Sequence, residues 1–197
     1  MNRWAIALSL TYGNVLAGFG AIILVVTGYP HEALIALIIG ALCDASDGVV
    51  ARHSPQTPLQ KKAGTVADSL ADIVTFGVFP AVFLATVTNL SPFALVVAIL
   101  YVLAALHRLV MFTAKALIDE TPTKVFSGAP VVTVAVALPL TTMIAEDTSW
   151  YSFGLTALLA VLALLYVSKL PVPKPHGIAA YISYGVLAAL FITGLLL

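Results

Sequence analysis

Residues 44–52 read Asp44-Ala-Ser-Asp47-Gly48-Val-Val-Ala51-Arg52, and residues 64–72 read Gly64-Thr-Val-Ala-Asp68-Ser-Leu-Ala-Asp72. The two aspartates of the first stretch are three residues apart and those of the second are four apart, so each pair lies on one face of a helix. The surrounding sequence is strongly apolar, and a carboxylate inside a membrane span marks a functional site by default. Two such helices packed face to face would bring four carboxylates together.

Four carboxylates that converge without cations would repel one another or bind protons. Hard divalent cations relieve this repulsion, and Mg²⁺ or Mn²⁺ suits carboxylates combined with a substrate phosphate. Gly48 and Gly64 leave room for a ligand to approach closely. Arg52 offers a planar fork of donors for phosphate. The predicted metal ligands are Asp44, Asp47, Asp68 and Asp72.

The composition predicts an integral membrane protein. Of the 197 residues, 61% are hydrophobic and 9% are charged, and the formal net charge of zero gives no indication of nucleic-acid binding. The single Cys43 excludes an internal disulfide. Apolar runs of about 20 residues predict membrane spans. These runs lie near residues 5–28, 33–52, 64–88, 92–117, 127–145, 150–168 and 177–197.

The distribution of basic residues predicts the orientation. If the N-terminus is in the cytoplasm, all nine Lys and Arg residues fall at or near the cytoplasmic ends or inner halves of the spans. The outer loops then carry no Lys or Arg, and their charged residues are Glu32, Glu146 and Asp147. The acidic stretches therefore open towards the cytoplasm. Lys61 and Lys62 are interpreted chiefly as anchors at an anionic membrane surface.

The two stretches together resemble the signature of the CDP-alcohol phosphotransferases, Asp-x2-Asp-Gly-x2-Ala-Arg-x8-Gly-x3-Asp-x3-Asp. Every named position is present, although eleven residues instead of eight separate Arg52 from Gly64. The insert contains Pro55 and Pro58, which is typical of a loop. The resemblance implies an all-α integral membrane protein with a six-span helical core in residues 1–175. Residues 176–197 would add a seventh span.

The resemblance also implies a reaction, in which a CDP-activated lipid loses CMP while its phosphate passes to an alcohol. It implies two ions of Mg²⁺ or Mn²⁺ on the four aspartates, Asp72 as the base that accepts the proton of the alcohol, and a homodimer. Arg52 would hold phosphate or brace the carboxylates, and Asn14 would contact substrate or form a helix–helix hydrogen bond. The implied donor-binding residues are Asn14, Asp47, Gly48, Ala51, Arg52, Gly64 and Asp68.

Residues 68–80 resemble the corresponding stretch of the membrane-embedded phosphatidylserine synthases, Asp-Ser-x-Ala-Asp-x-Val-[Ser/Thr]-Phe-Gly-x-x-Pro. We therefore predict L-serine as the acceptor and CDP-diacylglycerol or CDP-archaeol as the donor. Arg108 and Lys124 are candidate acceptor-binding residues, and Arg108 could instead pair with an aspartate of the site. The fourth span departs from the usual sequence pattern of this subfamily, because Met111 stands in place of a basic residue and Thr113 in place of an asparagine.

Two alternatives stay open. The same transfer could use glycerol 3-phosphate or inositol phosphate as the acceptor, although the scarcity of basic residues favours a less anionic alcohol. Carboxylates within spans also mark ion pathways, so a cation transporter is a more remote alternative. Transporters often carry internal repeats, and none is visible in this sequence.

Overall fold

A computed structural model describes residues 3–118, 125–168 and 171–173 of the chain. The expected seventh span near 177–197, the residue Lys124 and the end of the expected 1–175 core lie outside the described residues. The elements in chain order are α1 (Arg3–Val26), α2 (Pro30–Arg52), α3 (Pro58–Asp72), the π-helix η1 (Ile73–Val78), α4 (Phe79–Val87), α5 (Pro92–Ile118), β1 (Val125–Ser127), the 3₁₀-helix η2 (Val131–Thr133), α6 (Val134–Ala145), α7 (Tyr151–Val167) and β2 (Pro171–Pro173).

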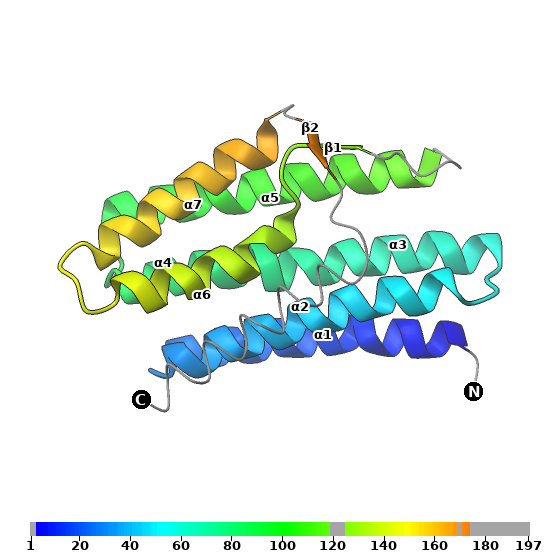
Figure 1. The fold of residues 1–197 in the computed structure, drawn as a ribbon, viewed down its shortest axis with the longest axis horizontal. Helices are drawn as coiled ribbons and strands as arrows, with labels where there is room; N and C mark the ends of the chain where they lie inside the picture. Colours follow the sequence, from blue (N-terminus) through cyan, green and yellow to red (C-terminus); the bar gives the residue numbers. More distant parts are fainter. Residues whose placement is uncertain (1–2, 119–124, 169–170, 174–197) are drawn as a thin grey trace.

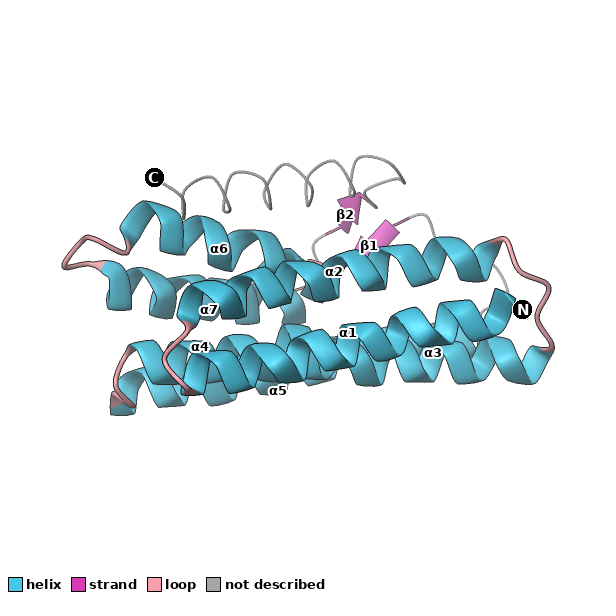
Figure 2. Ribbon diagram, turned by 90° about the horizontal axis from the view of Figure 1, so that it is seen from below, coloured by secondary structure: helices cyan, strands magenta, loops and turns pink. Residues whose placement is uncertain are grey.

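The helices run roughly along one long axis of the molecule (Figures 1 and 2), and β1 pairs with β2 in a short antiparallel ladder. Within the described residues, four helical stretches are long and apolar enough to cross a membrane: α1, α2, α3 continued through α4, and α5. The segments 131–145 and 151–167 are shorter apolar helices. The prediction of an all-α, multi-pass membrane protein is confirmed.

The loop between the second and third predicted spans is shorter than the sequence indicated. We expected residues 53–63 to be irregular because of their prolines, but α3 begins at Pro58. A capping box starts this helix: the Gln60 amide donates to the Thr57 side chain at 3.2 Å, and the Thr57 amide donates to the Gln60 side chain at 3.0 Å. Pro58 is at the first helical position, where its missing N–H has no cost.

The helix that carries Asp68 and Asp72 widens into η1 directly after Asp72. In an α-helix the Phe76 carbonyl would accept from residue 80, which is a proline and has no N–H. The Val74 carbonyl instead accepts from the Phe79 amide, five residues further on, which is the spacing of a π-helix. The fully buried Tyr101 of α5 donates its hydroxyl proton to the Phe76 carbonyl oxygen at 2.6 Å. This bond ties α5 to η1 close to Pro80.

Glycines allow α1 and α2 to approach η1 closely. A Cβ atom built on Gly18 would overlap the Thr75 hydroxyl and stand 2.8 Å from the Thr75 Cα atom. A Cβ atom on Gly40 would stand 2.8 Å from the Thr75 Cγ2 atom. These distances are too short for real side chains, so only glycine permits this approach.

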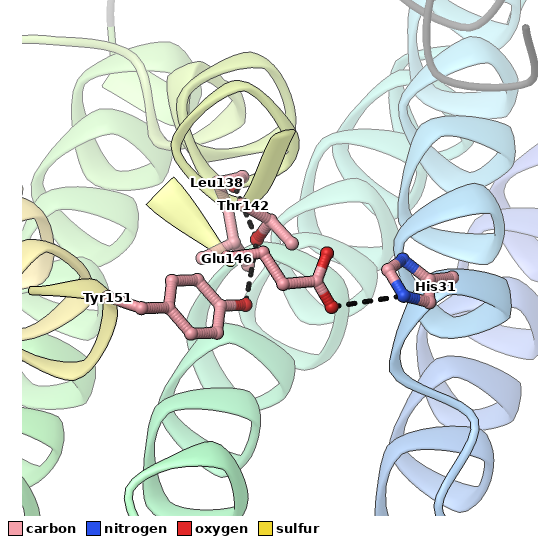
Figure 3. Close-up of polar contacts among 5 residues, drawn as sticks. All are labelled: His31, Leu138, Thr142, Glu146 and Tyr151. Atoms are coloured by element: carbon pink, nitrogen blue, oxygen red, sulfur yellow. Dashed lines mark hydrogen bonds and ion pairs between the residues drawn. The ribbon is translucent and has the colours of Figure 1, made fainter. Parts of the chain in front are cut away.

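The bundle end that holds the start of α2 carries a separate set of polar contacts between helices (Figure 3). The Nε2 atom of His31 on α2 lies 3.1 Å from the Oε1 atom of Glu146, which follows α6. The Tyr151 hydroxyl on α7 donates to the Thr142 hydroxyl on α6 at 3.2 Å. His31 is about 20 Å along α2 from Asp44, so these contacts tie the helices together far from the acidic stretches.

Replacing Gly18 tests the close approach of α1 to η1. We expect Gly18→Ala to destabilise the protein by about 1–3 kcal/mol, because the new methyl group meets backbone as well as side-chain atoms. The matched control is Gly20→Ala on the same helix, where no atom lies within 4 Å of the added Cβ. This change should leave the stability equal or raise it by up to about 1 kcal/mol. Equal melting temperatures for the two variants in detergent would contradict the packing argument.

Replacing Tyr101 tests its hydrogen bond to the Phe76 carbonyl oxygen. We expect Tyr101→Phe to cost about 1–3 kcal/mol, because the buried Phe76 carbonyl oxygen loses its donor. Tyr12→Phe is the control, since Tyr12 is 57% exposed. Thermal unfolding of both variants in detergent measures the difference, and a loss below about 0.5 kcal/mol for Tyr101→Phe would show that the bond adds nothing.

Candidate metal centre and adjoining cavity

Three of the four predicted acids converge. Asp44 on α2 and both Asp68 and Asp72 on α3 each offer one carboxylate oxygen, and these oxygens all lie within 4.8 Å of one another. Asp72 is buried, and the other two are partly buried. The spacing of four residues between Asp68 and Asp72 returns the chain to the same helix face, as the sequence predicted.

The three carboxylates fit a hard divalent cation. The Asp68 Oδ1 atom is buried and has no hydrogen-bond partner among the described residues. A buried acceptor without a partner is costly, and such a group in a native structure indicates a function or a ligand. Oxygen-only donor sets are those that Mg²⁺ and Mn²⁺ prefer. We name Asp44, Asp68 and Asp72 the three-acid cluster.

Asp47 is not part of the three-acid cluster. Its Oδ2 atom accepts a hydrogen bond from the Thr11 hydroxyl of α1 at 2.6 Å, and the residue is 6% exposed. Three residues along an α-helix turn the side chain by about 300°, so Asp47 points about 60° away from Asp44. This offset directs Asp47 towards α1 and an adjoining cavity, and its role as a metal ligand stays a prediction.

A cavity of about 520 Å³ lies among α1, α2, α3 and the loop that joins α2 to α3. Its volume is within the range of small-molecule sites. The cavity has both polar and apolar walls, and it reaches the three-acid cluster at Asp68. The lining residues are Trp4, Ala7, Leu8, Thr11, Asp47, Gly48, Ala51, Arg52, Ser54, Gln56, Lys61, Gly64, Thr65 and Asp68.

Six of the seven residues predicted to bind the donor line this cavity, and Asn14 is the exception. Its side chain is fully buried, and its Nδ2 atom donates to the Asp72 Oδ1 atom at 3.1 Å. This is the helix–helix hydrogen bond that the sequence left as an alternative. The two glycines face open space, because a Cβ on Gly64 would meet nothing within 4 Å and one on Gly48 would only touch Arg52 at 3.4 Å.

The cavity wall that α1 provides was not predicted from the sequence. Trp4, Leu8 and Thr11 are spaced by four and three residues, which places them on one helix face. Because most other residues of this helix are also apolar, the sequence does not show which face lines the cavity. The packing of α1 against α2 and α3 shows it. Lys61 also lines the cavity, although we had interpreted it chiefly as a membrane anchor.

The predicted acceptor residues do not line this cavity within the described part of the chain. Arg108 on α5 is buried, its Nε atom donates to the Ala129 carbonyl oxygen at 3.2 Å, and its guanidinium lies 6.0 Å from the centre of the Phe112 ring. Lys124 lies outside the described residues. The acceptor-binding roles of both residues stay predictions.

Comparisons with known proteins identify the family. The profile of the family described as CDP-alcohol phosphatidyltransferase matches residues 4–167. The chain therefore belongs to the CDP-alcohol phosphatidyltransferase family, and the resemblance inferred from the acidic signature is confirmed.

Several relatives carry more specific names. The chain is 28% identical over 202 residues to a CDP-diacylglycerol–serine O-phosphatidyltransferase of Mycobacterium leprae, with 98% of this chain and 65% of the relative covered. It is 30% identical to the enzyme of that name from Mycobacterium tuberculosis, with 93% and 66% covered. An archaetidylserine synthase of Methanothermobacter thermautotrophicus is 27% identical, with 85% and 69% covered. The chain thus spans about two thirds of the length of the mycobacterial relatives.

Metal binding can be tested through stability alone. We expect Mn²⁺ to raise the melting temperature of the wild-type protein in detergent. A ligand that binds only the folded state and is present at 100 times its Kd raises the free energy of unfolding by about 2.7 kcal/mol. Asp68→Asn should lose this rise, and without metal it should be at least as stable as the wild type because one repulsive charge is gone. Asp147→Asn, a change at an exposed residue, is the control. The same rise in Asp68→Asn as in the wild type would remove Asp68 from the metal site.

Proposed function

We propose that this protein transfers a phosphatidyl or archaetidyl group from a CDP-activated lipid to the hydroxyl of L-serine and releases CMP. One observation carries the proposal: a cavity lined by six residues of the signature adjoins the three-acid cluster. The names of the mycobacterial and archaeal relatives support serine as the acceptor. These names also support both diacyl and archaeol donors, since the relatives differ in that lipid.

The cavity holds the CDP part of the donor in this proposal. Arg52 and Lys61 line it and supply positive charge for the diphosphate, with the fork of Arg52 suited to two phosphate oxygens. Gly48, Ala51 and Gly64 present little or no side chain, so a nucleotide can approach the helix backbones.

Asp44, Asp68 and Asp72 would hold divalent cations, and Asp47 would complete the set from the side of the cavity. Two ions of Mg²⁺ or Mn²⁺ suit a diphosphate substrate. When bound, they neutralise the charge that develops on the phosphate oxygens during the transfer. The chain itself contributes the placement of these carboxylates on two rigid helices beside the cavity.

Asp72 accepts the proton of the serine hydroxyl. As that proton leaves, the serine oxygen forms a bond to the phosphorus that carries the lipid, and the bond from this phosphorus to the CMP oxygen breaks. Asp72 suits this role because it is buried and is held by a neutral donor, the Asn14 amide, which leaves its charge intact. Arg108 is the candidate for the serine carboxylate, with Lys124 as a second candidate.

The cavity opens to the cytoplasm in this proposal, with the N-terminus on the same side. Support comes from Arg52 and Lys61 at the cavity and from the basic residues near that end of the spans. Residues 1–175 form the transferase core, residues 176–197 add a seventh span, and two copies of the chain associate as a homodimer.

The decisive experiment measures CMP release by the purified protein in detergent with Mn²⁺. CDP-diacylglycerol and CDP-archaeol are each combined with serine, glycerol 3-phosphate or inositol phosphate. Release that requires serine and is lost in EDTA supports the proposal, and the two donors distinguish the lipid classes. Release with another alcohol would keep the chemistry and overturn serine as the acceptor. Failure with every acceptor would overturn the transferase proposal.

Replacing Asp72 tests the proposed base. We expect Asp72→Asn to lower kcat by about 10²–10⁴-fold, since this is the usual contribution of a general base. The variant should keep the melting temperature of the wild type within a few degrees, because asparagine fills the same volume. Asp147→Asn is the matched control and should keep full activity. Activity near the wild-type value in Asp72→Asn would show that another group accepts the proton.

A further inference from the structure

Helix α1 carries none of the acids of the signature, yet it donates a hydrogen bond to two of them. The Thr11 hydroxyl donates to the Asp47 Oδ2 atom at 2.6 Å, and the Asn14 Nδ2 atom donates to the Asp72 Oδ1 atom at 3.1 Å. Thr11 is 5% exposed and Asn14 is fully buried. The two donors are three residues apart, so one face of α1 contacts an acid of α2 and an acid of α3.

The bond from Thr11 is committed to the carboxylate. A hydroxyl has one proton, and the alternative acceptor of Thr11, the Ala7 carbonyl oxygen, is further away at 3.2 Å. A bond of 2.6 Å to a carboxylate is within the range of charge-assisted hydrogen bonds, which are the stronger kind. Thr11 thus engages one oxygen of Asp47 on the cavity side, outside the three-acid cluster.

The amide of Asn14 is held in one orientation by Asp72. The Asn14 Oδ1 atom is buried without a hydrogen-bond partner among the described residues. A rotated amide would place this oxygen against the carboxylate of Asp72 and lose the hydrogen bond, so the observed orientation is the favourable one. An unpaired buried oxygen costs stability, which indicates that the residue serves something other than stability.

The backbone of α1 cannot move away from Asp72. The Thr75 hydroxyl donates to the carbonyl oxygen of Asn14 at 3.0 Å, and it comes from the π-helix that begins directly after Asp72. Gly18 brings α1 against the same threonine. Asn14 is therefore fixed both by its own side chain and by its backbone.

We propose that Thr11 and Asn14 are positioning residues that divide the acids between two tasks. Thr11 holds Asp47 at the donor cavity, and Asn14 holds Asp72 for proton transfer. Both donors are neutral, so they orient a carboxylate and leave its negative charge available to a cation. A lysine in the same place would neutralise that charge. This inference rests on the proposed function, because it assigns different steps of that reaction to the two acids.

The test compares Thr11→Val and Asn14→Leu, which remove each donor while keeping the number and branching of the non-hydrogen side-chain atoms. CMP release gives kcat and the KM for the CDP-activated lipid at saturating serine. We expect Thr11→Val to raise the KM for the donor about 10-fold and to change kcat less than about threefold. We expect Asn14→Leu to lower kcat about 10- to 100-fold and to change that KM less than about threefold, because a small misplacement of a reacting group has effects of this size.

Two further variants separate positioning from folding. Thr11→Ser keeps the hydroxyl and should restore the KM of the wild type. Asn14→Ala removes the same donor without added bulk, and it replaces Asn14→Leu if the latter does not fold. Ser9→Ala is the matched control on α1, because the exposed Ser9 hydroxyl donates only to the Ala5 carbonyl of its own helix. It should leave kcat, KM and the melting temperature unchanged.

The inference would be overturned if Thr11→Val and Asn14→Leu lowered kcat equally and in proportion to their loss of melting temperature. Unchanged kinetics in both variants would also overturn it. If the wild-type protein released no CMP with any acceptor, the proposed function would fail separately. Mn²⁺ binding by calorimetry would then decide the inference. Thr11→Val and Asn14→Leu should each weaken Mn²⁺ binding about 10-fold and Ser9→Ala should not; equal affinities in all of them would overturn the positioning roles.

Discussion

The mutual repulsion of three carboxylates inside an apolar helix bundle is the constraint on which the rest of the structure depends. One carboxylate oxygen from each of Asp44, Asp68 and Asp72 lies within 4.8 Å of the other two, and Asp72 is buried while the other two residues are partly buried. Carboxylates in such surroundings bind protons or a cation, because neither burial nor proximity favours their charged forms. A divalent ion would relieve this electrostatic cost, and the three-acid cluster adjoins a cavity of about 520 Å³.

Precise placement of these acids comes from features without charge. Pro80 cannot continue a regular α-helical hydrogen-bond pattern, the chain after Asp72 widens into a π-helix, and Tyr101 donates to the Phe76 carbonyl oxygen. Gly18 lets α1 come close enough for Thr75 to bind the backbone of Asn14. The side chain of Asn14 then reaches Asp72. Each of these contacts constrains the next, so a defect in packing would be transmitted to the carboxylates.

The family profile of the CDP-alcohol phosphatidyltransferases covers all the helices that surround the acids. The acids and the glycines of the signature come from α2 and α3, whereas α1 supplies one wall of the cavity and hydrogen bonds to two acids. The short contacts at the opposite end, such as that between His31 and Glu146, tie α2 to α6 without involving the site. The contact between His31 and Glu146 therefore joins two helices far from the three-acid cluster.

The sequence by itself determined the membrane class, the helical fold and the acids, because hydropathy, helical periodicity and the spacing of the aspartates are local properties. It also predicted six of the residues that line the cavity. Only the tertiary structure separated Asp47 from the three-acid cluster and joined Asn14 to Asp72, since both depend on how α1 packs against α2 and α3. The start of α3 at Pro58 follows from a local signal, the Thr57–Gln60 capping box, which the interpretation of residues 53–63 as a loop missed. Contacts between helices leave no regular period in the sequence, so they could not be predicted from it.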